Sequence, residues 1–220
     1  MASSPQSHLP PDVAEARARL GQAFRRLGHT IAGHHITSDD ADATTIALAA
    51  LTDQLAAGDR RDRVTERPTG DWGPAPADGA RMYSFDERPV SGRSAPLGFD
   101  VDVFRQGNEA VGRVTLRSAH EGAPARSHGG IVSALFDDLL GFVLTIEQQP
   151  AFTGELTIRY EAPTPIDEPL ECRVRLTERD GRKLHMTGEL TVLRTGQVTA
   201  RSRAIFIAID PEMFRQGAQS

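Results

Sequence analysis

A single long helical pattern, set among segments that alternate with period two, limits the folds open to this chain of 220 residues. Apolar side chains recur at helical spacing from Gly129 to Glu147. Apolar and polar residues alternate in two segments before this helix and in four after it, at residues 97–103, 114–116, 156–160, 170–176, 184–192 and 198–209. Because no other element is available to bury the apolar side of the helix, we predict an α+β fold in which an antiparallel β-sheet wraps around one long central helix.

Two helices are predicted ahead of this domain. The first covers residues 12–33, where apolar residues recur at helical spacing, namely Leu20, Phe24, Leu27 and Ile31. The second begins at the capping residue Ser38 and stops before Gly58. A polar segment rich in Gly and Pro follows, and Trp72 is expected to anchor it to the domain. We therefore predict a helical appendage (1–60), a linker (61–87), the sheet domain (88–210) and a C-terminal tail (211–220).

The charge balance argues against two classes of partner. The net charge is −5 and the isoelectric point about 5.8, so the chain has no general attraction to nucleic acid or to an anionic membrane surface. The N-terminus lacks the basic start and apolar stretch of a secretory signal, and the longest apolar run, residues 139–146, is too short to cross a bilayer. We expect a soluble, cytoplasmic protein without nucleic-acid or membrane partners.

Cysteine and histidine usage indicates no metal site. Cys172 is the only cysteine, which excludes an intramolecular disulfide and a four-cysteine zinc framework. His34 and His35 are adjacent in the predicted loop between the two helices, and they lack acidic or cysteine ligands at zinc spacing. The chain also lacks a Gly-rich phosphate-binding loop. We predict no metal and no organic cofactor.

The start of the central helix suits the stabilisation of an oxyanion. His128 is followed by Gly129 and Gly130, which let a ligand approach the main chain closely. The N–H groups of a helix's first turn point outward and carry the positive end of the helix dipole. A thioester carbonyl that becomes an oxyanion would be stabilised there.

Asp137 is the one ionisable group on a face of small residues along the same helix. This face comprises Gly130, Ser133, Ala134, Asp137 and Gly141. Asp137 lies eight residues beyond Gly129, which corresponds to about 12 Å along a helix axis. One chain therefore cannot bring both groups to one carbonyl. If both act in one reaction, two copies of the helix run antiparallel across a two-fold axis, and each active site is shared by two subunits.

The residues His128-Gly129-Gly130, Asp137-Asp138 and Gly141 resemble the H-G-G-x6-D-[DE]-x2-G motif of PaaI-like thioesterases in the 4-hydroxybenzoyl-CoA thioesterase superfamily. The strand from Thr153 to Tyr160 and the later hairpins are similar to the family as well, so the resemblance covers residues 88–209. It implies the hotdog fold, with an N-terminal two-helix appendage similar to that of some members. It also implies hydrolysis of an acyl-CoA substrate by a homodimer or homotetramer with shared active sites.

The resemblance implies a role for each residue of the motif. Gly129 N–H would donate to the oxyanion, and Asp137 would act as nucleophile or general base. His128 would be a positioner near the thioester, and Thr153 would help to orient water. No coenzyme A contact is implied for any residue. One departure from the family is the segment Gly122-Ala123-Pro124-Ala125, where relatives often have Gly-Pro-Pro-Gly.

Each of these residues also has a structural interpretation. His128 could be a helix-entry residue that bonds to local backbone, and Thr153 shares the alternation of polar strand residues such as Glu155. Asp137 could be an interface carboxylate, although its register with His128 favours catalysis. Asp138 falls on the apolar side of the helix, so we expect it to be structural. For the whole chain, the alternatives are a non-catalytic acyl-CoA-binding or regulatory hotdog module and an enoyl-CoA hydratase on the same fold.

Overall fold

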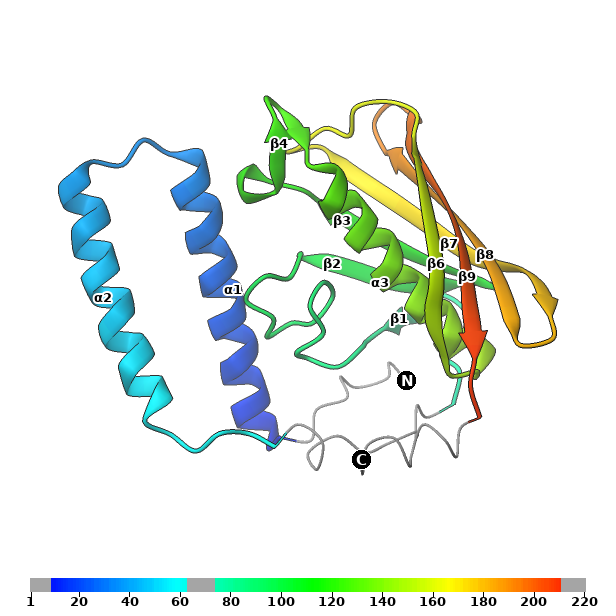
Figure 1. The fold of residues 1–220 in the computed structure, drawn as a ribbon, viewed down its shortest axis with the longest axis horizontal. Helices are drawn as coiled ribbons and strands as arrows, with labels where there is room; N and C mark the ends of the chain where they lie inside the picture. The colour runs from blue at the N-terminus through cyan, green and yellow to red at the C-terminus, as the bar shows by residue number, and fades with distance from the viewer. Residues whose placement is uncertain (1–8, 63–73, 211–220) are drawn as a thin grey trace.

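The computed structural model describes residues 9–62 and 74–210. Trp72 and the predicted C-terminal tail lie outside the described residues. Figure 1 shows a curved sheet wrapped around α3 (Gly129–Glu147), with α1 (Pro11–Gly33) and α2 (Ser38–Ala56) standing to one side. The predicted α+β hotdog class is confirmed, and α3 covers the predicted central helix from end to end.

The main sheet has seven strands, paired antiparallel in the order β1-β2-β3-β7-β8-β9-β6. Its strands are β1 (Arg81–Met82), β2 (Val101–Gln106), β3 (Glu109–Thr115), β6 (Ala151–Tyr160), β7 (Pro169–Asp180), β8 (Lys183–Val192) and β9 (Val198–Ala208). A 3₁₀ turn, η1 (Ser118–His120), and a small hairpin of β4 (Glu121–Ala123) and β5 (Arg126–Ser127) precede α3. β6 follows α3 directly and lies at one edge of the sheet.

The central helix is held by apolar contacts with the sheet. Leu135, Phe136 and Leu139 of α3 are fully buried in one core with residues of β3, β7, β8 and β9. Burial of one such side chain stabilises the fold by about 1.5–3 kcal/mol. At Gly112 of β3 a Cβ atom would lie 2.7 Å from Leu139 Cδ1, so glycine permits the close approach of helix and sheet. By length and composition α3 is apolar enough to cross a membrane, but 56% of its apolar stretch is buried inside the protein.

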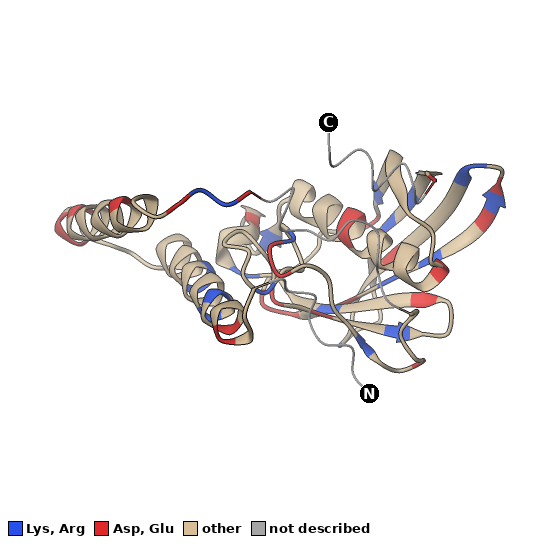
Figure 2. Ribbon diagram, turned by 90° about the horizontal axis from the view of Figure 1, so that it is seen from below, with Lys and Arg blue, Asp and Glu red and all other residues tan. Residues whose placement is uncertain are grey.

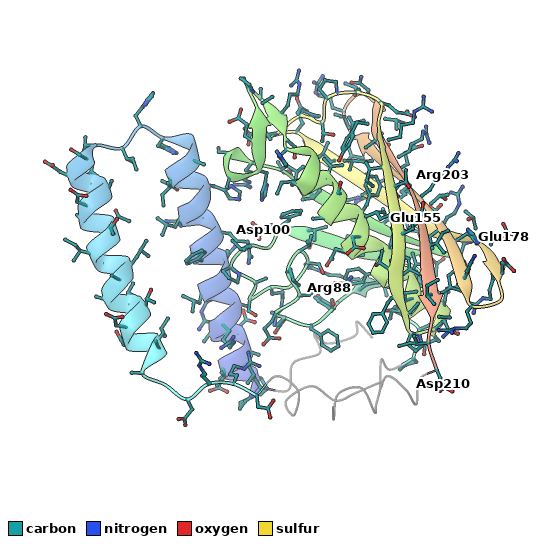
Figure 3. The ribbon with its side chains drawn as sticks, in the orientation of Figure 1. Arg88, Asp100, Glu155, Glu178, Arg203 and Asp210 are labelled. Carbon is teal, nitrogen blue, oxygen red and sulfur yellow. The ribbon has the colours of Figure 1, made fainter. Side chains whose placement is uncertain are left out.

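The helix α1 contacts the body mainly through small side chains and Arg25, whereas most of its apolar stripe is exposed. The buried residues of α1 are Ala14, Ala18, Gly21 and Arg25. A Cβ atom at Gly21 would lie 2.7 Å from the backbone of Ser94, which shows how close the helix comes. The Arg25 guanidinium forms an ion pair of 2.8 Å with Asp100, which Figure 3 labels on the side of the body that faces α1.

The structure corrects two details of the N-terminal half. Thr37, and not Ser38, caps α2, because Thr37 Oγ1 accepts a hydrogen bond of 3.1 Å from Asp40 N–H. The segment predicted as a linker (61–87) contributes to the folded domain, since β1 pairs with β2 and the Asp86 side chain is buried. The polar composition of the segment gave no sign of these contacts.

Candidate active site

His128 caps the N-terminus of α3. Its ring Nδ1 accepts a hydrogen bond of 3.0 Å from Gly130 N–H, and its main-chain N–H donates to the His120 carbonyl oxygen at 2.8 Å. With Nδ1 acting as acceptor, the neutral ring carries its proton on Nε2. The backbone of Gly122 packs against His128, where a Cβ atom would lie 2.7 Å from His128 Cα. His128 thus makes the local backbone contact that its structural interpretation predicts. Its side chain is also exposed at the site.

The Gly129 N–H is available to a ligand. It is the first N–H of α3, and no acceptor bonds to it within the part of the chain that the structure describes. The Gly129 carbonyl oxygen accepts hydrogen bonds from Tyr160 Oη at 2.8 Å and from Ser133 Oγ at 3.1 Å. The Tyr160 contact ties the start of the helix to β6 and holds the Gly129 peptide in place. Sequence reasoning missed Tyr160, whose only signal was a tyrosine in an otherwise aliphatic alternation.

Asp137 is exposed on α3, and its carboxylate accepts a hydrogen bond of 2.9 Å from Thr153 Oγ1. The sequence alternation had grouped Thr153 with Glu155, but a β-bulge at this point shifts the register of β6 against β9. Thr153 is therefore opposite Phe206, a core residue, and Glu155 is opposite Ile205. The extra residue turns Thr153 to the helix side of the sheet, where Asp137 lies. The argument from parity that made Thr153 an ordinary strand residue is wrong.

A cleft of about 270 Å³ opens beside Asp137 and Thr153. Its walls come from residues 74–88, the second half of α3 and the start of β6. The lining is largely apolar and includes Met82, Tyr83, Phe85, Phe142, Phe152 and Phe206. The segment predicted as a linker thus supplies one wall of the cleft. An apolar group of a ligand can be buried there with its polar end at the Asp137 carboxylate.

Asp138 has an environment opposite to that of its neighbour. It is buried, and its Oδ1 accepts a hydrogen bond of 2.6 Å from Arg88 Nε, while its main-chain oxygen accepts one of 2.6 Å from Arg88 Nη2. Arg88 lies in the segment below α3 in Figure 3 and stacks on the Phe142 ring at 5.0 Å. Gly141 makes room for it, because a Cβ atom there would collide with Arg88 Nη2. These contacts agree with the predicted structural role of Asp138.

The structure does not bring Gly129 and Asp137 together in one chain. Both lie on the continuous helix α3, with Tyr160 beside the first and Thr153 beside the second. Eight residues of helix separate them, or about 12 Å of rise. Within the described residues, neither group therefore belongs to the surroundings of the other.

Other reactive groups are placed away from this site or are unsuited to it. Cys172 is buried in the core, and burial raises the pKa of its thiol, so it cannot serve as a nucleophile. His34 and His35 are exposed between α1 and α2. In residues 9–62 and 74–210 no group of three or more His, Cys, Asp or Glu side chains is arranged to hold a metal ion.

Part of the chain matches a known protein family. Residues 127–199, which contain α3 and the strands β6 to β8, match the family model of the thioesterase superfamily. Acyl-coenzyme A thioesterase THEM4 of Mus musculus is 28% identical over 92 residues, which are 42% of this chain and 40% of the mouse protein. THEM4 of Bos taurus is 24% identical over 118 residues, 53% of this chain and 48% of that protein. The chain thus spans less than half the length of these relatives.

One solved structure shows the same fold over nearly the whole chain, appendage included. It is the crystal structure of a thioesterase superfamily protein with a TM-score of 0.73 and 24% sequence identity, and the alignment covers 94% of both chains.

Proposed function

We propose, from the thioesterase-superfamily domain formed by residues 127–199, that this chain hydrolyses an acyl-CoA thioester to a free acid and coenzyme A. The observation that carries the proposal is the pairing of two features on one helix. α3 offers an unpaired N–H at Gly129, and it holds the exposed Asp137 carboxylate against Thr153 beside an apolar cleft. The first suits a developing oxyanion, and the second suits attack on a carbonyl or activation of water.

The reaction requires two copies of the chain, because the two groups are too far apart along one helix. The edge strand β6 supports a specific pairing. Its outer side has no strand partner among the described residues, and Phe152 and Tyr160 on it are 60% and 51% exposed. An exposed strand edge presents unpaired N–H and C=O groups that favour pairing with another strand. We therefore propose a homodimer in which two β6 strands pair antiparallel across a two-fold axis.

The register of this pairing follows from the contacts of β6. Thr153 lies beside Asp137, and Tyr160 lies beside Gly129. If the two-fold axis passes near Leu156 and Thr157, residue 153 of one strand is opposite the region of residue 160 of the other. The Asp137 carboxylate of one copy then faces the Gly129 N–H of the second. Each dimer has two such sites.

In the proposed mechanism the thioester oxygen accepts a hydrogen bond from Gly129 N–H, and the acyl group occupies the cleft. Asp137 either removes a proton from water as the water oxygen bonds to the carbonyl carbon, or bonds to that carbon itself. In the first route the C–S bond breaks and the proton passes to the leaving thiolate. In the second route the thiolate leaves first, and water then hydrolyses the acyl-aspartyl anhydride. Thr153 positions the carboxylate in both routes.

The experiment is the release of free thiol from a panel of acyl-CoAs by the wild type, Asp137→Asn and the control Asp53→Asn. Asp53 is an exposed helical carboxylate on α2, outside the site. We expect Asp137→Asn to lose at least about 100-fold in kcat, in the range typical for loss of a general acid or base, and the control to keep full rate. Wild-type protein that binds these thioesters without hydrolysing any would favour the binding-module alternative. Full activity of Asp137→Asn would remove Asp137 from the mechanism.

The cytoplasmic location stays a prediction, for which fractionation of the native host is the test.

A further inference from the structure

The two N-terminal helices expose apolar side chains that nothing in the described chain covers. On α1, Leu20, Phe24 and Ile31 are 55%, 47% and 45% exposed. On α2, Leu51 and Leu55 are 54% and 66% exposed, and no residue of this helix is buried. In Figure 1, α2 stands outside α1, on the side away from the sheet domain. Helices in proteins gain most of their stability from packing an apolar face, so an uncovered helix of this kind implies a partner.

The exposed stripe of α1 is not the side of the helix that docks on the body. The body contacts Ala14, Ala18, Gly21 and Arg25. The stripe of Leu20, Phe24, Leu27 and Ile31 lies roughly a third of a turn around the helix, at about 100° per residue. Arg25 holds this orientation, because its guanidinium is buried and bonds to the Ala95 carbonyl at 2.8 Å and to Asp100. The body therefore fixes the direction in which α1 presents its stripe.

Both stripes have the spacing of a coiled-coil seam. On α1 the apolar positions are separated by four, three and four residues, at Leu20, Phe24, Leu27 and Ile31. On α2 the separations are three, four, three and four residues, at Ala41, Thr44, Leu48, Leu51 and Leu55. Such a seam packs against other helices at a small crossing angle. Ala41, Thr44 and Leu48 are half-buried, so contacts within the chain cover only the beginning of the α2 seam.

The charges of the two helices are complementary. Apart from the buried Arg25, α1 carries three arginines against two carboxylates, whereas α2 carries four aspartates and no basic residue. Figure 2 shows acidic residues alone on the outermost helix, α2, and basic residues on α1. An α2 helix is therefore attracted to an α1 helix and repelled by another α2. This pattern identifies a second copy of the same chain as the partner, arranged with α2 of each copy against α1 of the other.

We infer that the α1–α2 hairpins of two copies associate around a two-fold axis into an antiparallel four-helix bundle. The α1 and α2 seams of both copies form its core, which is the arrangement in which four amphipathic helices with short connections bury their apolar sides. This interface is separate from the β6 edge, since Figure 1 shows the hairpin and β6 apart, with the start of α3 between them. If the two-fold axes of the two interfaces are perpendicular and intersect, four copies form a closed tetramer. The inference does not depend on the proposed hydrolysis.

The test is the molar mass in solution, measured by light scattering on the full chain, for the wild type, Leu51→Glu/Leu55→Glu and Ile46→Glu. The control Ile46 is also a large aliphatic residue of α2 and is 71% exposed, but it lies on the side opposite the seam. We expect the double variant to have half the mass of the wild type and the control to keep the full mass. Loss of the bundle halves the mass whether or not β6 also pairs. The result therefore separates the bundle from the proposed β6 dimer. An unchanged mass for the double variant would overturn the inference.

A second measurement guards against unfolding of α2 in the double variant. Ile46→Cys places a single accessible thiol on the outer side of α2, because the native Cys172 is buried. Copies labelled with a donor dye and copies labelled with an acceptor dye are mixed and allowed to exchange. Energy transfer between them supports the bundle. Absence of transfer, with helical content unchanged, contradicts it and points to closure of α2 on its own α1.

Discussion

Removal of the Arg88 side chain should destabilise the protein strongly, because it would leave the buried Asp138 carboxylate without its partner. Asp138 is 6% exposed and Arg88 25% exposed, with 2.6 Å between Nε and Oδ1. Loss of one member of a buried pair costs about 3–5 kcal/mol. Asp138 Oδ2 already lacks a hydrogen-bond partner among the described residues, so no second side chain there can replace Arg88. Since Arg88 retains some contact with solvent, we expect the lower end, about 3 kcal/mol for Arg88→Met.

Urea unfolding at pH 7, with the free energy extrapolated to water, measures this loss. The matched control is Arg81→Met, which removes an arginine whose ion pair with Asp102 is exposed on both sides. An exposed pair contributes about 0–1 kcal/mol, so the control should stay close to the wild type. The double variant Arg88→Met/Asp138→Leu should regain part of the loss, since it removes both charges. If Arg88→Met lost no more than Arg81→Met, the pair with Asp138 would not be the contact that holds residues 74–100 on α3.

Two further predictions concern the site and its support. Thr153→Val removes the hydrogen bond to Asp137, so kcat for thioester hydrolysis should fall by about 10- to 100-fold, the equivalent of about 1.5–3 kcal/mol for a bond to a charged group. The control Thr153→Ser keeps the hydroxyl and should retain most of the rate. Equal losses in the two variants would contradict a positioning role for Thr153. Burial, followed by the neighbouring His29, lowers the pKa of His120 to about 4, so the unfolded state binds more protons between pH 6.5 and 4. The free energy of unfolding should therefore be full above pH 6.5 and fall by up to about 3 kcal/mol as the pH drops to 4. His120→Asn, which keeps an acceptor for Arg117 N–H, should lose this part of the pH dependence in urea titrations at pH 7 and pH 5, and a slope equal to that of the wild type would refute it.

Features set by local periodicity could be predicted from the sequence. The helix Gly129–Glu147, the four strands after it and the hairpin turn at Gly181 all have signals within a few neighbouring residues. Features set by register between distant segments could not. The bulge that turns Thr153 toward Asp137 depends on how β6 pairs with β9, more than 40 residues later, and no local pattern records it.

The side on which α1 docks also differs from the side that its local apolar pattern marks. The apolar stripe from Leu20 to Ile31 predicted the helix but not the side that docks, because Gly21 allows an approach to the Ser94 backbone that larger side chains would block. The role of Arg88 was hidden for a similar reason, since its partner lies 50 residues away. In both cases only the fold showed what these residues contact.

The two adjacent carboxylates of α3 gain different roles from about 100° of helix rotation. Asp138 faces the core and is neutralised by Arg88, which allows a charged residue to be buried in an otherwise apolar helix. Asp137 faces outward, and among the described residues its carboxylate accepts a hydrogen bond from the uncharged Thr153 hydroxyl and forms no ion pair. Such a carboxylate is available as base or nucleophile in the proposed reaction, in which a second copy supplies the oxyanion donor. An arginine beside Asp137, like the one beside Asp138, would weaken Asp137 as the base or nucleophile of the proposed reaction.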